Sequence, residues 1–220
     1  MIFLNPKKYD IEHSDKSFQE IIHKTINFFE SKGLAKIKDD DHHNTWYSDF
    51  LEFVKKEKIF ATLLTPSKYG DKSDRWDTWR IAQYNEILAF YGLSYWYTWQ
   101  VSILGLGPIW MTDNERLKQR TAKLLKEGEI FAFGLSERKH GADIYSTEMN
   151  LTQEKDGTYK ANGSKYYIGN ANIAKMVSTF GKMADSGDYI FFAVNSQHEN
   201  YNCVKNVVSS QNYVAEYTLD

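Results

Sequence analysis

One short polar segment holds four consecutive side chains of the kinds that bind metals. Asp40, Asp41, His42 and His43 offer carboxylate and imidazole groups, which are common ligands of zinc. Potential ligands so close together on a loop more often belong to a solvated linker. We therefore interpret residues 39–44 as a polar break between helices, and we predict no metal site.

Two further residues have side chains suited to contacting a ligand, Ser136 and Tyr167. Taken alone, Ser136 is best interpreted as a strand-end hydroxyl that hydrogen-bonds a nearby backbone group. Tyr167 alone is best interpreted as an aromatic side chain of the core or of a cross-strand pair. A ligand role for either residue needs support from the segments around it.

Composition limits the classes of function to consider. The net charge of −2 shows no basic excess that would suggest nucleic-acid binding, and the sequence has no acidic tail that would suggest disorder. The single cysteine, Cys203, excludes an internal disulfide, as is usual in a reducing compartment. Residues 1–8 hold too short an apolar run for a signal peptide, and no stretch is apolar enough to cross a bilayer. We expect a cytoplasmic protein.

The first part of the chain has the pattern of helices, because apolar residues recur at helical spacing. Ser14 and Asp15 can cap the first helix, and Thr112, with Glu115 three residues later, can cap the last. The Gly-Leu-Gly-Pro run at 105–108 is expected to end the fourth helix. The expected helices cover residues 14–33, 47–57, 74–91, 93–106 and 112–128.

The pattern changes after Gly128 to short segments rich in β-branched and aromatic residues. Turn signals such as Asp156-Gly157 and Asn162-Gly163 separate them. We predict an α+β fold, with an N-terminal all-α domain, residues 1–128, followed by a small antiparallel β-barrel-like domain, residues 129–220. The expected strands are 129–136, 146–153, 158–162, 165–168, 176–181, 189–195, 202–208 and 213–219.

Five sequence blocks follow one another in a specific order across this boundary. Together they resemble the acyl-CoA dehydrogenase family, from about residue 80 to residue 182, and more loosely toward both ends. The resemblance implies a truncated form of that fold, with FAD bound at the face of the β-domain beside a slot for an acyl-CoA thioester. The blocks are Gly107-Pro108, Lys118-Gln119, Leu125 with Gly128-Glu129, the segment from Leu135 to Asp143, and the segment from Asn162 to Asn170.

The resemblance also implies roles for individual residues around the cofactor. Ser136 stands where the family has a threonine that hydrogen-bonds the pyrimidine side of the flavin. Tyr167 replaces a tryptophan that lies along the flavin ring, and Gly169 replaces a threonine whose hydroxyl reaches flavin N5. The implied cofactor-binding residues are Phe133, Leu135, Ser136, Tyr167, Ile168 and Gly169.

Substrate contacts are implied at two places. The first is the fourth expected helix, whose counterpart in the family lines the acyl-chain pocket. For each residue there, packing in the helical core is the simpler interpretation. The second is the loop in which Arg138, Lys139 and His140 replace small residues of the family. These three side chains are suited equally to CoA phosphates and to solvent. The implied substrate-binding residues are Ser102, Ile103, Leu106, Gly141 and Ala142.

The family's catalytic base is a glutamate in a C-terminal helical bundle that has no counterpart here. None of Glu127, Glu129, Glu137 and Glu148 matches its position, so no catalytic residue is assigned. We expect an incomplete β-domain, and a chain that is inactive alone. Its parent would be a flavoenzyme of fatty acid metabolism that dehydrogenates an acyl-CoA thioester.

For that full-length protein the resemblance implies a homodimer or homotetramer. The electron-transfer acceptor stays unidentified. Two alternatives remain open. One is a related flavin oxidase or monooxygenase, and the other is a non-catalytic helical interaction or ligand-carrier module.

Overall fold

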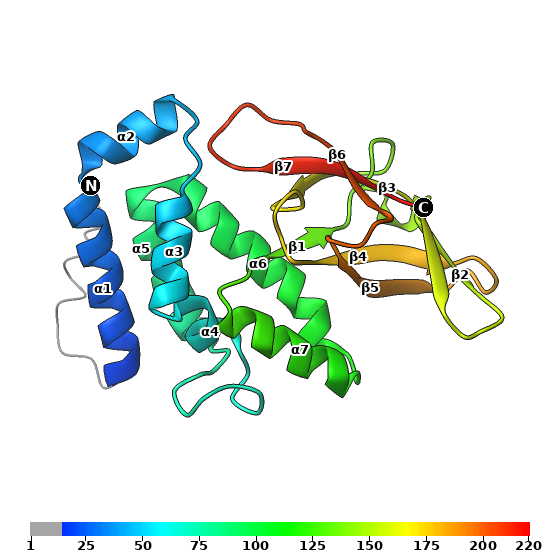
Figure 1. Cartoon of the computed structure of the whole chain (residues 1–220), viewed down its shortest axis with the longest axis horizontal. Helices are drawn as coiled ribbons and strands as arrows, with labels where there is room; N and C mark the ends of the chain where they lie inside the picture. The colour runs from blue at the N-terminus through cyan, green and yellow to red at the C-terminus, as the bar shows by residue number, and fades with distance from the viewer. Residues whose placement is uncertain (1–14) are drawn as a thin grey trace. The chain divides into compact units, whose positions relative to one another are not determined.

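The computed structural model describes residues 15–220, which fold into helices followed by strands (Figure 1). Two compact units are present. The helical unit holds the described residues up to Trp99 together with Asn114–Glu129, and the sheet unit holds Gln100–Asp113 together with Ile130–Asp220. The expected domain boundary after residue 128 stays a prediction. The expectations for Ser14 and for residues 1–8 lie outside the described residues.

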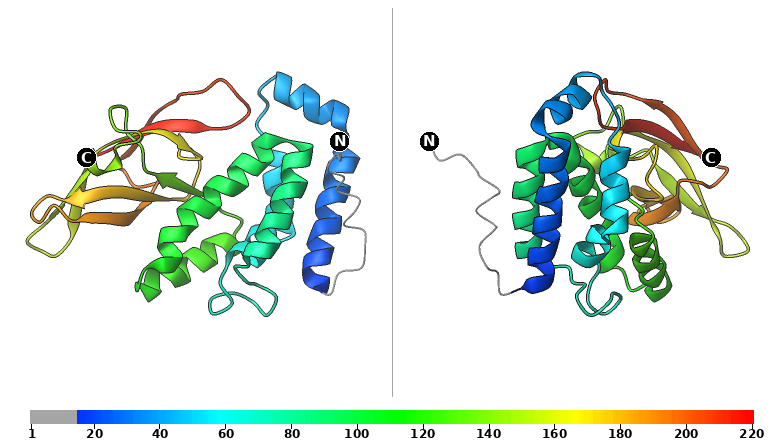
Figure 2. Two further views of the ribbon diagram at one scale, coloured as in Figure 1. Left: turned by 180° about the vertical axis from the view of Figure 1, so that it is seen from behind. Right: turned by 60° about the vertical axis from the view of Figure 1, so that its left-hand side comes forward.

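The helical unit is built from helices that pack side by side. Helix α1 packs beside α2 and α5, and α4 packs beside α3 and α7 (Figure 2). Helix α6 begins in this unit and ends in the sheet unit. The bounds are α1 Lys16–Lys32, α2 Leu34–His42, α3 Ser48–Lys56, α4 Ile59–Leu64, α5 Thr78–Tyr91, α6 Leu93–Met111 and α7 Glu115–Lys126.

Large aromatic side chains fill the core of the helical unit. Phe29, Phe50, Tyr84 and Trp99 are fully buried, and such rings bury more apolar area than any other side chain. The ends of the helices are satisfied locally. Asp15 accepts the backbone N–H of Phe18 at 3.1 Å, as an N-cap residue does. No helix among residues 15–220 is long and apolar enough to cross a membrane.

Three expectations for the helices are wrong. Residues 39–44 are not a polar break, because α2 continues to His42 and buries Asp40, whose carboxylate pairs with Lys32 at 2.9 Å and Lys36 at 2.8 Å. The Gly-Leu-Gly-Pro run does not end α6, which continues through Pro108 to Met111. Helix α7 is capped by Asn114 rather than Thr112, since the Asn114 side chain accepts the N–H of Leu117 at 3.0 Å.

The sheet unit contains seven paired strands with a short 3-10 turn, Ile144–Ser146, before β2. The strand order is β1-β4-β2-β3-β7-β6, with β5 on the outer side of β4. The pairs β1–β4 and β2–β4 are parallel and the others antiparallel. The bounds are β1 Phe131–Gly134, β2 Asn150–Gln153, β3 Tyr159–Gly169, β4 Met176–Met183, β5 Tyr189–Asn195, β6 Tyr201–Asn206 and β7 Val214–Leu219.

The predicted α+β class is confirmed, but the sheet is mixed and not closed into a barrel. The two strands expected on either side of Asn162-Gly163 are one strand, β3. Gly163 is required there for another reason. Its φ is +144°, and a Cβ would lie 2.9 Å from the Cα of Met149, so only glycine lets the two backbones approach.

Candidate functional site

The predicted site begins where strand β1 leaves the sheet. Strand β1 runs parallel to β4, and its first two residues, Phe131 and Ala132, are fully buried. The half-buried residues Leu135 and Ser136 follow directly. A buried strand is thus followed by a partly exposed backbone segment, and binding groups are commonly found on such segments next to a rigid scaffold.

Two hydrogen bonds join Ser136 to Tyr166 on strand β3. The Ser136 hydroxyl donates to the Tyr166 carbonyl at 2.8 Å, and the Tyr166 N–H donates to the Ser136 carbonyl at 2.9 Å. The hydroxyl therefore does satisfy a nearby backbone group, as its position at the strand end suggested. The same bonds bring Ser136 beside Tyr167, so the structure places these two predicted site residues together.

Tyr167 lies at an irregularity of β3. The pairing of β3 with β7 shifts register between Lys165 and Ile168, and Tyr167 adopts φ +65° with 57% of its surface exposed. A non-glycine residue at positive φ is strained, and bulges often redirect a side chain next to a site. The bulge turns the tyrosine ring outward instead of into a cross-strand pair.

The remaining predicted cofactor residues lie on the same strands. Ile168 is buried and pairs with Ala215, and Gly169 pairs with Val214. Phe133 is half-buried, and its ring stacks on Phe191 with a centroid distance of 5.4 Å. Phe133, Leu135 and Ser136 thus come from the end of β1, whereas Tyr167, Ile168 and Gly169 come from the end of β3.

The predicted substrate residues are divided between buried and exposed positions. Ser102 and Leu106 on α6 are fully buried, and the Ser102 hydroxyl accepts the N–H of Phe131 at 3.3 Å. Ile103 is half-buried. Gly141 and Ala142 lie exposed in the loop before β2. Ser102 and Leu106 therefore lie in the interior, whereas Gly141 and Ala142 lie at the surface.

Each basic side chain of that loop has an acidic partner within the sheet unit. Arg138 donates to both carboxylate oxygens of Glu216 on β7, at 2.7 and 2.6 Å. Lys139 pairs with Glu148 at 3.2 Å, and His140 Nδ1 lies 2.9 Å from Asp143. The contact with Asp143 raises the pKa of His140 above its usual 6.5. These partners favour a structural role for the three basic groups over binding phosphate.

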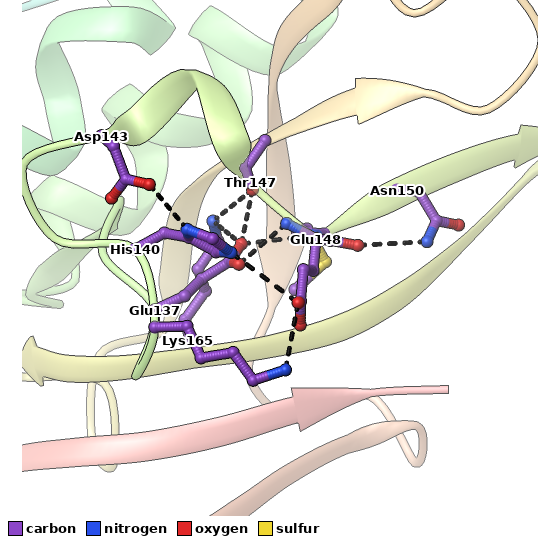
Figure 3. A network of polar contacts seen from close by, with 9 residues as sticks. Glu137, His140, Asp143, Thr147, Glu148, Asn150 and Lys165 are labelled. Carbon is purple, nitrogen blue, oxygen red and sulfur yellow. Dashed lines mark hydrogen bonds and ion pairs between the residues drawn. The ribbon is translucent and has the colours of Figure 1, made fainter.

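A buried ion pair joins Lys165 to Glu137 (Figure 3), and the Lys165 ammonium also donates to the Leu135 carbonyl at 2.9 Å. Lys165 is fully buried, and its ammonium lies 2.8 Å from Glu137. Burial lowers the pKa of Lys165 from its usual 10.5, although Glu137 opposes this. Burial also raises the pKa of Glu137, but hydrogen bonds from Lys165 and Thr147 outweigh it, so that pKa lies below the usual 4.5.

The sequence assigned no role to this ion pair. The only signal was a glutamate and a lysine, Glu137 and Lys165, each inside one of the five ordered blocks. Buried charges of this kind are rarely left unpaired.

Glu137, His140 and Glu148 place one potential metal ligand each within 4.8 Å of one another. Two ammonium groups already occupy the space around them, since Lys165 lies 2.8 Å from Glu137 and Lys139 lies 3.2 Å from Glu148. A divalent cation there would be repelled by both lysines. We assign no metal to this cluster.

Comparison with known proteins agrees with the ordered blocks. Residues 132–211 match the model of the acyl-CoA dehydrogenase middle domain. The chain is 26% identical over 174 residues to a short-chain specific acyl-CoA dehydrogenase of Megasphaera elsdenii. The resemblance to the acyl-CoA dehydrogenase family is confirmed. That alignment covers 78% of this chain and 45% of the relative.

Solved acyl-CoA dehydrogenase structures share the fold of the chain. Butyryl-CoA dehydrogenase from Megasphaera elsdenii superimposes with a TM-score of 0.83 and 24% identity, covering 96% of this chain and 57% of that one. An acyl-CoA dehydrogenase from Bacillus anthracis, complexed with FAD, superimposes with a TM-score of 0.79 and 20% identity, covering 96% and 36%. The chain thus spans about half the length of these acyl-CoA dehydrogenases or less.

Proposed function

We propose that the chain binds FAD on the backbone ledge formed by Ser136 and Tyr167. We define the ledge as segments 133–136 and 166–169. The parent protein would be an acyl-CoA dehydrogenase-type oxidoreductase that introduces an α,β double bond into an acyl-CoA thioester. The observation that carries the proposal is the pair of hydrogen bonds between Ser136 and Tyr166, at 2.8 and 2.9 Å, which holds the two segments together.

The polar groups of Ser136 fit one edge of a flavin. Its hydroxyl proton is committed to the Tyr166 carbonyl, so the hydroxyl oxygen is left to accept a hydrogen bond. Within residues 15–220, the Ser136 N–H makes no hydrogen bond and is available as a donor. The pyrimidine edge of a flavin offers one N–H donor between two carbonyl acceptors, which complements this pair.

Tyr167 supplies an aromatic surface next to these groups. Its ring is 57% exposed, because the positive φ turns it away from the sheet. Flat ring systems stack well on aromatic side chains. Gly169 brings no side-chain donor, so this segment can contact the flavin only through its backbone. When bound, the flavin would accept a hydride from the substrate, and the ledge would orient it and tune its electronics.

No carboxylate among residues 15–220 is assigned as the base that removes the α-proton. Glu137 is unsuited, because its oxygens accept hydrogen bonds from Lys165, Thr147, Glu148 and Met149. We therefore propose that the chain binds cofactor but does not turn over substrate alone. For the substrate, we propose contacts with α6 at Ile103 and with the loop at Gly141 and Ala142.

Reconstitution with FAD tests the proposal. The purified chain is incubated with FAD, freed of excess cofactor by gel filtration, and examined for flavin absorbance. We expect retained flavin in the wild type and its loss in a Ser136→Ala, Tyr167→Ala double variant. The matched control is Tyr159→Ala, an exposed tyrosine at the start of the same strand. A wild-type chain that retains no flavin contradicts the proposal.

A related flavin oxidase or monooxygenase would use the same ledge. The residues that favour this second function are Gly169, which lacks the family's hydroxyl near N5, and the Arg138–His140 segment. An assay of the full-length protein separates the two functions. Reduction of an electron-acceptor dye without oxygen consumption indicates a dehydrogenase, whereas hydrogen peroxide formation indicates an oxidase. Cytoplasmic location, fatty acid metabolism and a homo-oligomer stay predictions.

A further inference from the structure

Three acceptors from two segments, residues 135–137 and Thr147, take all the hydrogen bonds that the Lys165 ammonium can donate. It donates to the Leu135 carbonyl at 2.9 Å, to Glu137 Oε1 at 2.8 Å and to Thr147 Oγ1 at 3.2 Å. A lysine has three N–H donors, so each acceptor takes one. Lys165 is also fully buried, which leaves its ammonium no alternative partner in solvent.

The bond to Leu135 fixes the orientation of one peptide group. In a trans peptide the carbonyl and the following N–H point in opposite directions, and the described residues contain no cis peptide. Since the Leu135 carbonyl points toward the buried ammonium, the Ser136 N–H must point away from it. This is the N–H that has no hydrogen-bond partner within residues 15–220.

Glu137, which accepts from Lys165, also accepts hydrogen bonds from other groups. Glu137 accepts the backbone N–H of Glu148 at 2.8 Å and that of Met149 at 3.2 Å, and it also accepts the Thr147 hydroxyl. Figure 3 shows these groups converging around the ammonium. The ammonium is therefore held against the Leu135 carbonyl by groups that are themselves hydrogen-bonded.

We propose that Lys165 is a positioning residue for flavin binding, which holds the Leu135–Ser136 peptide so that the Ser136 N–H faces the cofactor. The inference rests on the FAD ledge proposed above. A buried ion pair alone is a weak source of stability, because an apolar pair of similar size is often as stable. The bond to Leu135 gives the ammonium a task that an apolar side chain cannot perform.

Variants of the full chain separate positioning from general stability. Lys165→Met removes the ammonium, and we expect the dissociation constant for FAD to rise about tenfold, as for loss of one well-placed hydrogen bond. Thr147→Val weakens the same buried cluster but leaves the bond to Leu135. We expect it to lower the melting temperature while the FAD dissociation constant stays within about twofold. Lys160→Met, an exposed lysine of the same strand, controls for loss of charge.

The Ser136 amide gives a direct readout that a purely structural role would not move. In a chain labelled with ¹⁵N-serine, the Ser136 resonance is identified by its absence from a Ser136→Ala variant. We expect FAD to shift this resonance and slow its hydrogen exchange in the wild type and in Thr147→Val. In Lys165→Met both effects should be lost. The wild-type exchange measurement stands by itself if Lys165→Met fails to fold.

The outcomes are distinct. A wild type that binds no FAD contradicts the ledge, and the inference about Lys165 with it. A wild type that binds FAD without protecting the Ser136 amide leaves the ledge intact and overturns the positioning role. The positioning role is equally overturned if Lys165→Met binds FAD as tightly as the wild type, or if Thr147→Val weakens binding as much as Lys165→Met.

Discussion

Arg138 donates two hydrogen bonds to Glu216, at 2.7 and 2.6 Å, and so connects the loop after β1 to strand β7. Its guanidinium carbon also lies 4.3 Å from the centre of the Tyr166 ring, within the range of a cation–π contact. A planar guanidinium matches a carboxylate in a way that lysine cannot. Arg138 thus holds the loop next to Tyr166, the residue to which Ser136 is hydrogen-bonded.

Replacement of Arg138 should loosen the loop without unfolding the sheet unit. The Arg138 side chain is half exposed, whereas Glu216 is buried and accepts both hydrogen bonds. For Arg138→Ala we expect faster hydrogen exchange across residues 138–146 and a small fall in the melting temperature, because Glu216 loses its partner. Arg138→Lys should restore little of the protection. Lys139→Ala is the control, since its pair with Glu148 is single and exposed. Equal exchange in Arg138→Ala and wild type contradicts this role.

Removal of Glu137 should be among the most damaging changes in the sheet unit. Glu137→Ala leaves the buried Lys165 ammonium without its counter-ion and leaves the N–H groups of Glu148 and Met149 without their acceptor. Breaking a buried pair from one side costs about 3–5 kcal/mol. Urea unfolding should show a loss of this size. The Glu137→Ala, Lys165→Met double variant should recover part of it, and failure to recover any contradicts the account.

The stability that Glu137 contributes should depend on pH in the acid range. Its folded pKa lies below the usual 4.5, so the unfolded chain binds more protons than the folded chain when the pH falls below that value. The contribution is therefore fully present above 4.5 and is lost as the pH falls through the folded pKa. Unfolding free energies of the wild type and Glu137→Ala should converge on acidification. A gap that is constant with pH would show that Glu137 acts without its charge.

Local signals in the sequence were sufficient for most elements and misleading where a tertiary contact decides. The Asn162-Gly163 pair is typical of a turn, but Gly163 lies within a strand because the Met149 backbone approaches it. The polar segment around Asp40 is typical of a linker, but two lysines neutralise its buried carboxylate. The Met149 backbone is too far from Gly163 in sequence for a local pattern to reveal it. Lys36, in contrast, lies one helical turn before Asp40, so this pair becomes recognisable once the segment is seen to be a helix.

In the candidate site, too, some features were predicted from the sequence and others depend on tertiary contacts. Ser136 and Tyr167 were identified from ordered blocks, and their neighbourhood in space follows from the pairing of Ser136 with Tyr166. The buried Lys165–Glu137 pair and the Arg138–Glu216 pair were not predicted, because each joins segments that only the folded sheet brings together. Glu216 in particular lies in the last strand, 78 residues from its partner.

Tyr167 should lower the stability of the fold while strengthening cofactor binding. An L-residue in the left-handed region costs roughly 1–2 kcal/mol, and glycine avoids that cost while losing more backbone entropy. Since the φ of Tyr167 is +65° and its ring is largely exposed, Tyr167→Gly should raise the free energy of unfolding by about 0.5 kcal/mol.

The same variant should bind FAD more weakly, because the exposed ring is lost, by about 1 kcal/mol or roughly fivefold in the dissociation constant. Tyr159→Gly is the matched control. It removes an equally exposed tyrosine from the same strand, at a position outside the left-handed region. We expect that change to lower stability by about 1 kcal/mol and to leave FAD affinity unchanged. If Tyr167→Gly instead destabilises the chain as Tyr159→Gly does, Tyr167 carries no strain, and the bulge does not serve to present its ring.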